Sequence, residues 1–111
     1  MTSLPIVDPT CCGTLPPALP TEEAAMTAAR FKALADPTRV QLLHLVSGSQ
    51  NGEACVCDLT DAVGLSQPTV SHHLALLVKA GFLTRERRGT WAWFRCDPTG
   101  AEAARAALKS I

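Results

Sequence analysis

The chain has 111 residues and a formal net charge of zero at pH 7, and 47% of its residues are hydrophobic. This length suits one compact domain, and no run of eighteen apolar residues is present that would span a bilayer. The N-terminus lacks the basic and then apolar pattern of a secretory signal, so we expect a cytoplasmic protein.

The charges are divided unevenly along the chain. Residues 1–65 carry three basic and seven acidic side chains, whereas residues 66–96 carry five basic side chains and a single acidic one. A segment with a net charge of +4 concentrates positive potential, as contact with nucleic-acid phosphates requires. A neutral chain can therefore still contain a basic DNA-binding surface.

The cysteines favour metal or redox chemistry over structural disulfides. Their number is odd and two of them are neighbours in the sequence: Cys11, Cys12, Cys55, Cys57 and Cys96. A secreted domain held by disulfides usually has an even, dispersed set. Clustered thiols in a reducing compartment more often bind metals or sense oxidants.

The proline distribution predicts two regions. Residues 1–20 contain five of the eight prolines and show no helical periodicity. We expect them to form a flexible N-terminal arm that carries Cys11 and Cys12. Residues 21–111 are then the folded domain.

Two helices are predicted at the start of this domain. Thr21 is a candidate N-cap for an Ala-rich helix that ends near Leu34. Asp36 followed by Pro37 predicts the start of a second helix. The stripe of this second helix that we expect to be buried comprises Val40, Leu43 and Val46.

Two shorter helices follow a polar loop at residues 48–53. The first is predicted at about residues 55–63, with Gly64 at its C-terminal end. Ser66 is a candidate N-cap for the next helix, which closes at residues 80–81. Its apolar spacing is helical and comprises Val70, Leu74, Leu77 and Val78.

The period then changes from helix to strand. Residues 83–87 and 91–96 predict a β-hairpin around a turn at residues 88–90. Asp97 and Pro98 predict a last helix that ends near Leu108. The expected fold is mainly α with a β-hairpin, a winged helix-turn-helix of four helices, two strands and a fifth helix.

The two short helices joined at Gly64 form a candidate helix-turn-helix, whose second helix would read DNA. That helix contains no acidic residue, and its outward side chains are short or planar hydrogen-bonding groups. These candidate DNA contacts are Gln67, Thr69, Ser71, His72 and His73.

The hairpin that follows carries a cluster of arginines at or near its tip: Arg85, Arg87 and Arg88. A basic wing beside a recognition helix is suited to flanking phosphates or the minor groove. The aromatic side chains of the hairpin have strand spacing, so we expect them to pack the wing onto the domain. They are Trp91, Trp93 and Phe94.

Several motifs, in this order, closely resemble the ArsR/SmtB family of metal-sensing repressors. They are Phe-Lys-Ala-Leu-Ala-Asp-Pro-Thr-Arg at 31–39, Cys-Val-Cys-Asp-Leu at 55–59, Ser-Gln-Pro-Thr-Val-Ser-His-His-Leu at 66–74 and Ala-Gly-Phe-Leu at 80–83. The resemblance covers roughly residues 21–109. It implies a homodimer built on the first and last helices that binds a palindromic operator and releases it on binding metal.

Carried over residue by residue, the resemblance makes the outward residues of the helix at 66–80 contacts to double-stranded operator DNA. It also makes Arg87 and Arg88 wing contacts. The zinc site that some members hold on the last helix is not expected, because residues 97–111 contain no histidine.

Cys55 and Cys57 are the first candidate metal ligands. On an ideal helix the positions i and i+2 point about 200° apart, so both bind one ion only if the first turn unwinds or if Cys55 precedes the helix. Cys57 has an alternative interpretation as a small buried side chain. Cys96, at a strand end, is expected to pack.

A third thiolate is missing from this motif, because Thr60 follows at the position where arsenite sensors of the family often have a cysteine. Cys11 and Cys12 are the expected source, in a layout that resembles some arsenite-responsive members. We therefore favour As(III) or Sb(III) as the inducer, with Cd(II), Pb(II) or Zn(II) as the alternative.

Other classes of protein fit less of the sequence. We expect no enzymatic activity, since Cys55-x-Cys57 lacks the redox spacing of thioredoxin-like enzymes. A cytosolic metal-binding chaperone needs the thiols but not the basic wing. A thiol redox-sensing repressor remains a third possibility.

Overall fold

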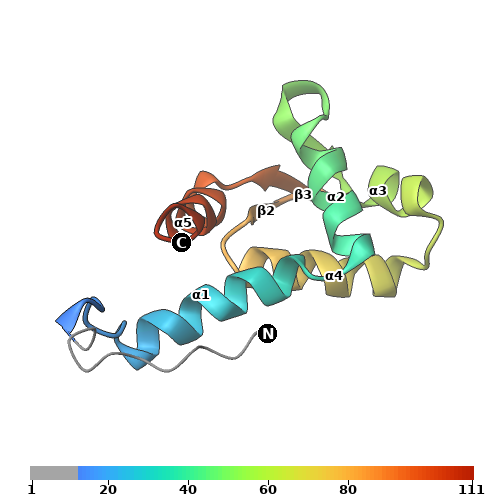
Figure 1. Ribbon diagram of the computed structural model, residues 1–111. Helices are drawn as coiled ribbons and strands as arrows, with labels where there is room; N and C mark the ends of the chain where they lie inside the picture. Colours follow the sequence, from blue (N-terminus) through green and yellow to red (C-terminus); the bar gives the residue numbers. More distant parts are fainter. Residues whose placement is uncertain (1–12) are drawn as a thin grey trace.

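The computed structural model describes residues 13–111, which form five α-helices and a three-stranded sheet (Figure 1). Their order is α1 (Thr21–Leu34), α2 (Pro37–Ser47), a short 3-10 turn (Gln50–Gly52), β1 (Glu53–Cys55), α3 (Val56–Val63), α4 (Gln67–Lys79), β2 (Leu83–Arg88), β3 (Trp91–Cys96) and α5 (Pro98–Lys109). The predicted winged helix-turn-helix is confirmed. No helix in the described range is long and apolar enough to cross a membrane.

Three of the predicted helix starts are confirmed by their caps. The Asp36 carboxylate accepts the backbone N–H of Arg39 at 3.1 Å, and the Ser66 hydroxyl accepts that of Thr69 at 3.4 Å. Asp97 caps α5 in the same way. Each side chain satisfies a backbone donor that the first turn of a helix leaves unpaired.

The predicted cap at Thr21 is wrong, because α1 begins with Thr21 itself and Pro20 is the N-cap, without a side-chain hydrogen bond. Pro20 has φ −53° and ψ 139°, and its carbonyl accepts the N–H of Ala24 at 3.1 Å. The side chain of proline has no hydrogen-bonding group, so α1 starts without a side-chain cap.

The core lies where α2, α3 and α4 meet the sheet. Its fully buried side chains come from three elements: Leu42 and Val46 of α2, Val70, Leu74 and Leu77 of α4, and Leu83 of β2. The stripe predicted for α2 is partly wrong, since Val40 is 51% exposed. Apolar residues surround most of this helix, so a period of 3.6 did not distinguish its buried face.

The hairpin of β2 and β3 is confirmed, but the sheet has a third strand that was expected to be loop and helix start. β1 pairs antiparallel with β3, with Glu53 opposite Arg95 and Cys55 opposite Trp93. The strand order is therefore β1-β3-β2. Because of this pairing, the segment that leads into α3 is attached to the wing.

The start of α5 is held against the turn between α4 and β2 by backbone contacts. Gly100 N–H donates to the Gly81 carbonyl at 2.8 Å, and Asp97 N–H donates to the Phe82 carbonyl at 2.9 Å. A Cβ atom on Gly100 would lie 2.6 Å from the Gly81 oxygen, so the approach requires glycine. α5 also contacts α1.

The division into an arm and a domain stays a prediction. Cys11 and Cys12 lie outside the described residues. Residues 13–20 are exposed and precede the first helix.

Candidate DNA interface and thiol site

The helix-turn-helix consists of α3, a turn at Gly64 and α4. Gly64 has φ 70°, the left-handed conformation that glycine adopts without strain, and its N–H donates to the Thr60 carbonyl at 3.1 Å. Ser66, the N-cap of α4, follows two residues later. This short connection turns the chain so that α4 lies along the underside of the domain in Figure 1.

The outward face of α4 has the composition predicted for a DNA-reading surface. Four of the candidate contacts are exposed: Gln67, Thr69, Ser71 and His72. The Thr69 hydroxyl lies 2.8 Å from that of Ser66, so it also takes part in the cap. No carboxylate occurs on α4 to repel phosphate.

The fifth candidate, His73, is placed differently. Its side chain is only 17% exposed, and its Nδ1 lies 3.2 Å from Nη1 of Arg39 and 3.9 Å from the Asp36 carboxylate. Arg39 is itself held by the Ala33 carbonyl at 2.6 Å. His73 therefore fastens α4 to the start of α2 and does not join the outward row.

The arginines of the wing are divided between its two faces. Arg88 donates to both Glu53 and Glu86, with the Glu86 contact at 2.9 Å, and its guanidinium lies 4.8 Å from the ring centre of Trp93. Arg95 donates to the other Glu53 oxygen at 2.6 Å. The predicted DNA contact Arg88 is thus engaged within the protein.

These ion pairs change the acid–base properties of the cluster. Hydrogen bonds from Arg88 and Arg95 lower the pKa of Glu53 from 4.5 to about 2, and the same carboxylate raises the pKa of Arg88. Glu53 is therefore ionised throughout the neutral range. We name Glu53, Glu86, Arg88 and Arg95 the wing clamp.

Arg85 and Arg87 occupy the other face of β2, which is turned towards α4. They pair with Phe94 and Ala92, respectively, on β3. Both line a crevice together with Gln67 and Ser71 of α4. Arg85 was recognised in the basic cluster but not among the predicted contacts; strand alternation, which places it on the same face as Arg87, is the signal that would have added it.

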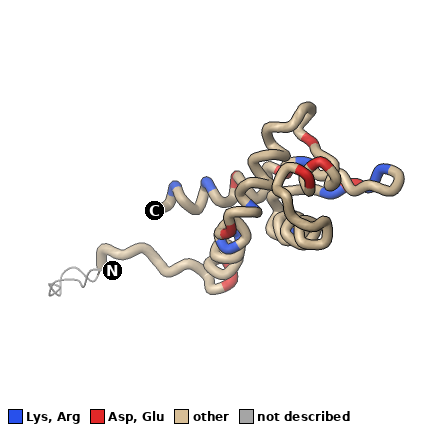
Figure 2. The backbone as a smooth tube through the Cα atoms, turned by 90° about the vertical axis from the view of Figure 1, so that its right-hand side faces the viewer, with Lys and Arg blue, Asp and Glu red and all other residues tan. Residues whose placement is uncertain are grey.

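The expectation that all three wing aromatics pack in the core is wrong for Trp91. Phe94 is 4% exposed, and Trp93 is partly buried against the core. Trp91 is 45% exposed. It lies near the tip of the hairpin, which projects beyond the helices (Figure 2).

Cys55 and Cys57 are brought together by the way α3 begins. Cys55 is the last residue of β1 and the N-cap of α3, and its sulfur accepts the backbone N–H of Cys57 at 3.4 Å. The two sulfur atoms lie 2.6 Å apart. Of the two arrangements that would allow a shared ion, the structure has the one in which Cys55 precedes the helix.

The local environment favours the protonated thiol at Cys57. The hydrogen bond with Cys55 raises its pKa above the ordinary 9.0, and partial burial and the charge of Asp58 act in the same direction. Cys96 is packed beside the core, and burial raises its pKa as well. Its placement agrees with the packing role expected of it.

Within residues 13–111, no group of three or more His, Cys, Asp or Glu side chains has the arrangement of a metal site. The described thiol site is a pair.

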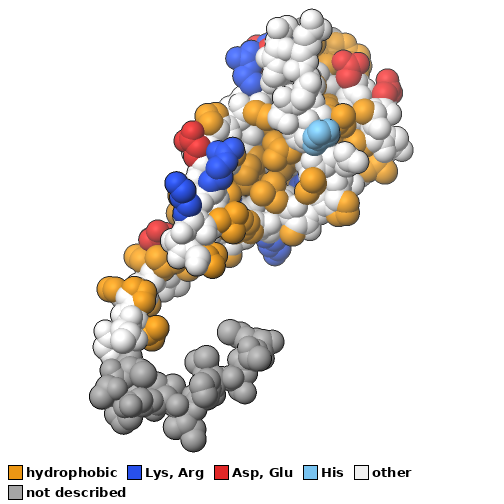
Figure 3. All heavy atoms as spheres, turned by 45° about the horizontal axis from the view of Figure 1, so that its top comes forward, with side chains coloured by type: hydrophobic (Ala, Val, Ile, Leu, Met, Phe, Trp, Pro, Cys, Tyr) orange, Lys and Arg blue, Asp and Glu red, His pale blue; other side chains and the backbone are white. Residues whose placement is uncertain are grey.

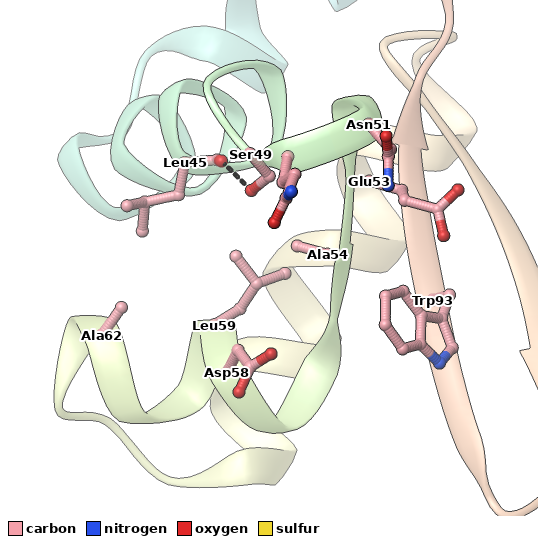
Figure 4. Close-up of a pocket in the computed structure, with 10 residues that line it drawn as sticks. Leu45, Ser49, Asn51, Glu53, Ala54, Asp58, Leu59, Ala62 and Trp93 are labelled. Carbon is pink, nitrogen blue, oxygen red and sulfur yellow. Dashed lines mark hydrogen bonds between the residues drawn. The ribbon is translucent and has the colours of Figure 1, made fainter.

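One hollow of the described surface lies between α2, α3 and the sheet (Figure 4). It measures about 480 Å³, and Asp58 and Leu59 of α3 face Trp93 of β3 across it. The Ser49 hydroxyl donates to the Leu45 carbonyl at its rim. The hollow adjoins Glu53 and so lies beside the wing clamp.

A helix-turn-helix with an acid-free reading helix, a basic wing and a thiol pair at the start of its first helix defines a class: winged-helix DNA-binding regulators. Residues 36–85 match the model of the bacterial regulatory protein family ArsR. A solved structure described as a possible transcriptional regulator for arsenical resistance has a TM-score of 0.67 and 32% identity, and the match covers 74% of this chain and 82% of that one. The chain belongs to the ArsR family.

Two curated relatives are named as regulators of resistance to an element. The arsenic resistance transcriptional regulator ArsR1 of Pseudomonas putida is 44% identical over 81 residues, which is 73% of this chain and 62% of that protein. The cadmium resistance regulatory protein CadC homolog of Staphylococcus aureus is 39% identical over 67 residues, which is 60% of this chain and 54% of the relative. The chain thus spans somewhat more than half the length of both.

Proposed function

We propose that this protein is a cytoplasmic transcriptional repressor that binds operator DNA as a homodimer and is released by trivalent arsenic or antimony. The observation that carries the proposal is the thiol pair at the first residues of α3. Cys55 and Cys57 lie 2.6 Å apart at the start of the helix that supports the reading helix. A ligand bound there acts directly on the helix-turn-helix.

The DNA-binding part of the proposal rests on α4 and the wing. Gln67, Thr69, Ser71 and His72 supply hydrogen-bonding groups for base edges and phosphates. Arg87 supplies a positive charge beside them. His73 and Arg88 support this surface from within the protein, by their contacts with Arg39 and Glu53.

A homodimer explains apolar side chains that this single chain leaves in water. Met26 of α1 and Leu108 of α5 are 56% and 57% exposed, and these two helices contact each other. Figure 3 shows hydrophobic side chains extending along α1 and onto the body of the molecule. Burying such a surface against a second copy is favourable.

The raised pKa of Cys57 favours a metalloid over a divalent cation. In neutral solution trivalent arsenic exists as uncharged As(OH)3, and each thiol that binds it replaces a hydroxyl and releases water. A divalent cation instead requires each thiol to lose its proton to solvent. Because the pKa of Cys57 is raised, a cation bears an added cost that As(OH)3 does not.

Cys11 and Cys12 complete the proposed set of ligands, since soft thiolates select soft ions and the described pair lacks a third sulfur. Cd(II), Pb(II) and Zn(II) are the alternative inducers, and the relative named for cadmium resistance supports the first of them. Proton release separates the two cases. When the protein is titrated in weak buffer, we expect arsenite to release no net protons and cadmium to release at least one proton per bound ion. Proton release on arsenite binding would contradict the exchange of thiols for hydroxyls proposed here.

Fluorescence anisotropy with a duplex from the protein's own promoter tests the whole proposal. We expect arsenite to dissociate the complex of the wild-type protein, and Cys55→Ser and the double change Cys11→Ser, Cys12→Ser to bind DNA normally without responding. Cys96→Ser is the matched control and should respond fully. Absence of DNA binding by the metal-free protein refutes the repressor; a full response without Cys11 and Cys12 removes them from the site.

The same sulfur pair supports a second candidate, a thiol redox-sensing repressor. Two thiols in contact are placed to form a disulfide with a peroxide, which yields two molecules of water per disulfide. Treatment with hydrogen peroxide in the absence of metalloid tests this function. Release of DNA that a thiol reductant reverses supports it, and retention of DNA with oxidised cysteines excludes it.

A further inference from the structure

We propose that the crevice between α4 and the wing binds one phosphate of the DNA backbone through Arg85 and Arg87. We call it the wing crevice; its polar lining comprises Gln67, Ser71, Arg85, Arg87 and Thr90, with Trp91 at its side. The inference rests on the proposed DNA-binding function. It adds which positive charges contact the backbone and which do not.

The position of the crevice corresponds to the path of a DNA strand. A recognition helix enters the major groove, and a wing reaches the adjacent minor groove. The sugar–phosphate backbone that separates those grooves has to pass between the two elements. In this protein the space between them is the wing crevice, with a volume of about 160 Å³.

The charges that face the crevice are available for an anion. Neither Arg85 nor Arg87 has a carboxylate within salt-bridge distance among the described residues, and both are exposed. In contrast, Arg88 and Arg95 are neutralised in the wing clamp. Side chains alternate between the two faces of β2. Arg85 and Arg87, which have no carboxylate partner, therefore lie on the face towards α4, and Arg88, which is paired with glutamates, lies on the opposite face.

The remaining lining suits a phosphate diester. Ser71 contributes a hydroxyl donor from α4, and a planar guanidinium matches two phosphate oxygens at once. Phe94 and Ala92 line the crevice with apolar surface, which limits hydration and strengthens the charge interaction.

The salt dependence of DNA affinity tests this assignment. We expect Arg85→Ala and Arg87→Ala each to weaken binding to operator and scrambled duplexes by the same factor, because a phosphate carries no sequence information. The slope of log affinity against log salt should fall by about 0.9 for each phosphate that the variant no longer neutralises. Arg95→Ala, on the same sheet but paired with Glu53, is the control and should keep the slope.

A neutral methylphosphonate placed at successive positions of the operator locates the contact. One position per half-site should weaken binding of the wild-type protein and have no further effect on Arg87→Ala. Arg87→Lys should keep the salt slope but lose part of the affinity, since it retains charge without the planar fork.

Three results would refute the phosphate site but not the proposed repressor function. They are an unchanged salt slope in both arginine variants, a loss of affinity for the operator but not for the scrambled duplex, or a further loss of affinity in Arg87→Ala at every methylphosphonate position. Thermal unfolding of each variant should match that of the wild-type protein, which shows that weaker binding does not come from a damaged fold. Failure of the wild-type protein to bind any duplex would refute the proposed function itself.

Discussion

Neighbouring residues of the same type have different tasks in this protein. His72 is exposed on α4, whereas His73, about 100° further around the helix, contacts Arg39 of α2. Arg87 and Arg88 lie on opposite faces of β2. The identity of a residue in a motif therefore does not determine which side chain meets the DNA.

Substitution of the two histidines distinguishes their tasks. We expect His72→Ala to weaken operator binding and to leave the melting temperature unchanged. His73→Ala should lower the melting temperature by several degrees, since removing this partly buried hydrogen bond costs about 1 kcal/mol and this corresponds to about 4–8 °C in a domain of this size. Differential scanning fluorimetry and anisotropy measure the two effects; equal melting temperatures would contradict the role given to His73.

At the residue scale the sequence predicted chemical types better than orientations. The outward position of four α4 residues followed from helical period, and the contact between Cys55 and Cys57 was one of two alternatives that the spacing allowed. The inward turn of His73 depends on Arg39, which lies 34 positions earlier in the chain. Local patterns contain no information about such a distant partner.

Among the elements, β1 has the largest consequence for function. It is three residues long and contains both Glu53, which holds the wing through Arg88 and Arg95, and Cys55 of the thiol pair. A ligand that moves Cys55 would therefore also displace β1, the strand whose Glu53 holds the wing. Sequence patterns missed β1 because three residues are too few to show alternation.

Glu53→Gln tests this connection. The amide keeps the shape of the side chain but removes the charge that binds two arginines. We expect arsenite to bind with unchanged affinity, while the ratio of DNA affinities without and with arsenite shrinks by about threefold or more, within the usual range of coupling energies. Glu86→Gln, which affects Arg88 alone, is the control.

Glu53→Gln frees Arg88 and Arg95, which can raise DNA affinity with and without arsenite alike. Such a general gain cancels in the ratio of the two affinities. An unchanged ratio in Glu53→Gln would show that the signal reaches the DNA through α3 and α4 alone. A ratio that shrinks equally in both variants would assign the effect to Arg88 and not to the strand.

For the whole molecule, the order of helices, hairpin and last helix was predictable from caps and periodicity. Asp36, Ser66 and Asp97 each mark a helix start by a local rule that the structure confirms. What remained unpredictable is how distant elements are joined. The contact of Gly81 with Gly100 belongs to this kind, since in the sequence Gly81 resembles an ordinary helix end and Gly100 an ordinary residue in the first turn of a helix.

Gly100→Ala tests the joint between α5 and α4. The added carbon meets backbone atoms, which do not yield as a flexible side chain does. We expect a loss of about 1–3 kcal/mol in the free energy of unfolding, as in other overpacked sites. Glu102→Ala, exposed on the same helix, should have little effect, and urea unfolding of both variants makes the comparison.

The backbone contact between Gly81 and Gly100 also affects the geometry of the proposed homodimer. If two copies pair through α1 and α5, the backbone contact at Gly100 fixes how α5 lies against the end of α4 in each copy, and so helps to set the distance between the two reading helices. Such a dimer measures the separation of two half-sites along the DNA. An operator lengthened by one base pair displaces a half-site by about 3.4 Å and rotates it around the axis, so this protein should reject it even when every base it reads is unchanged.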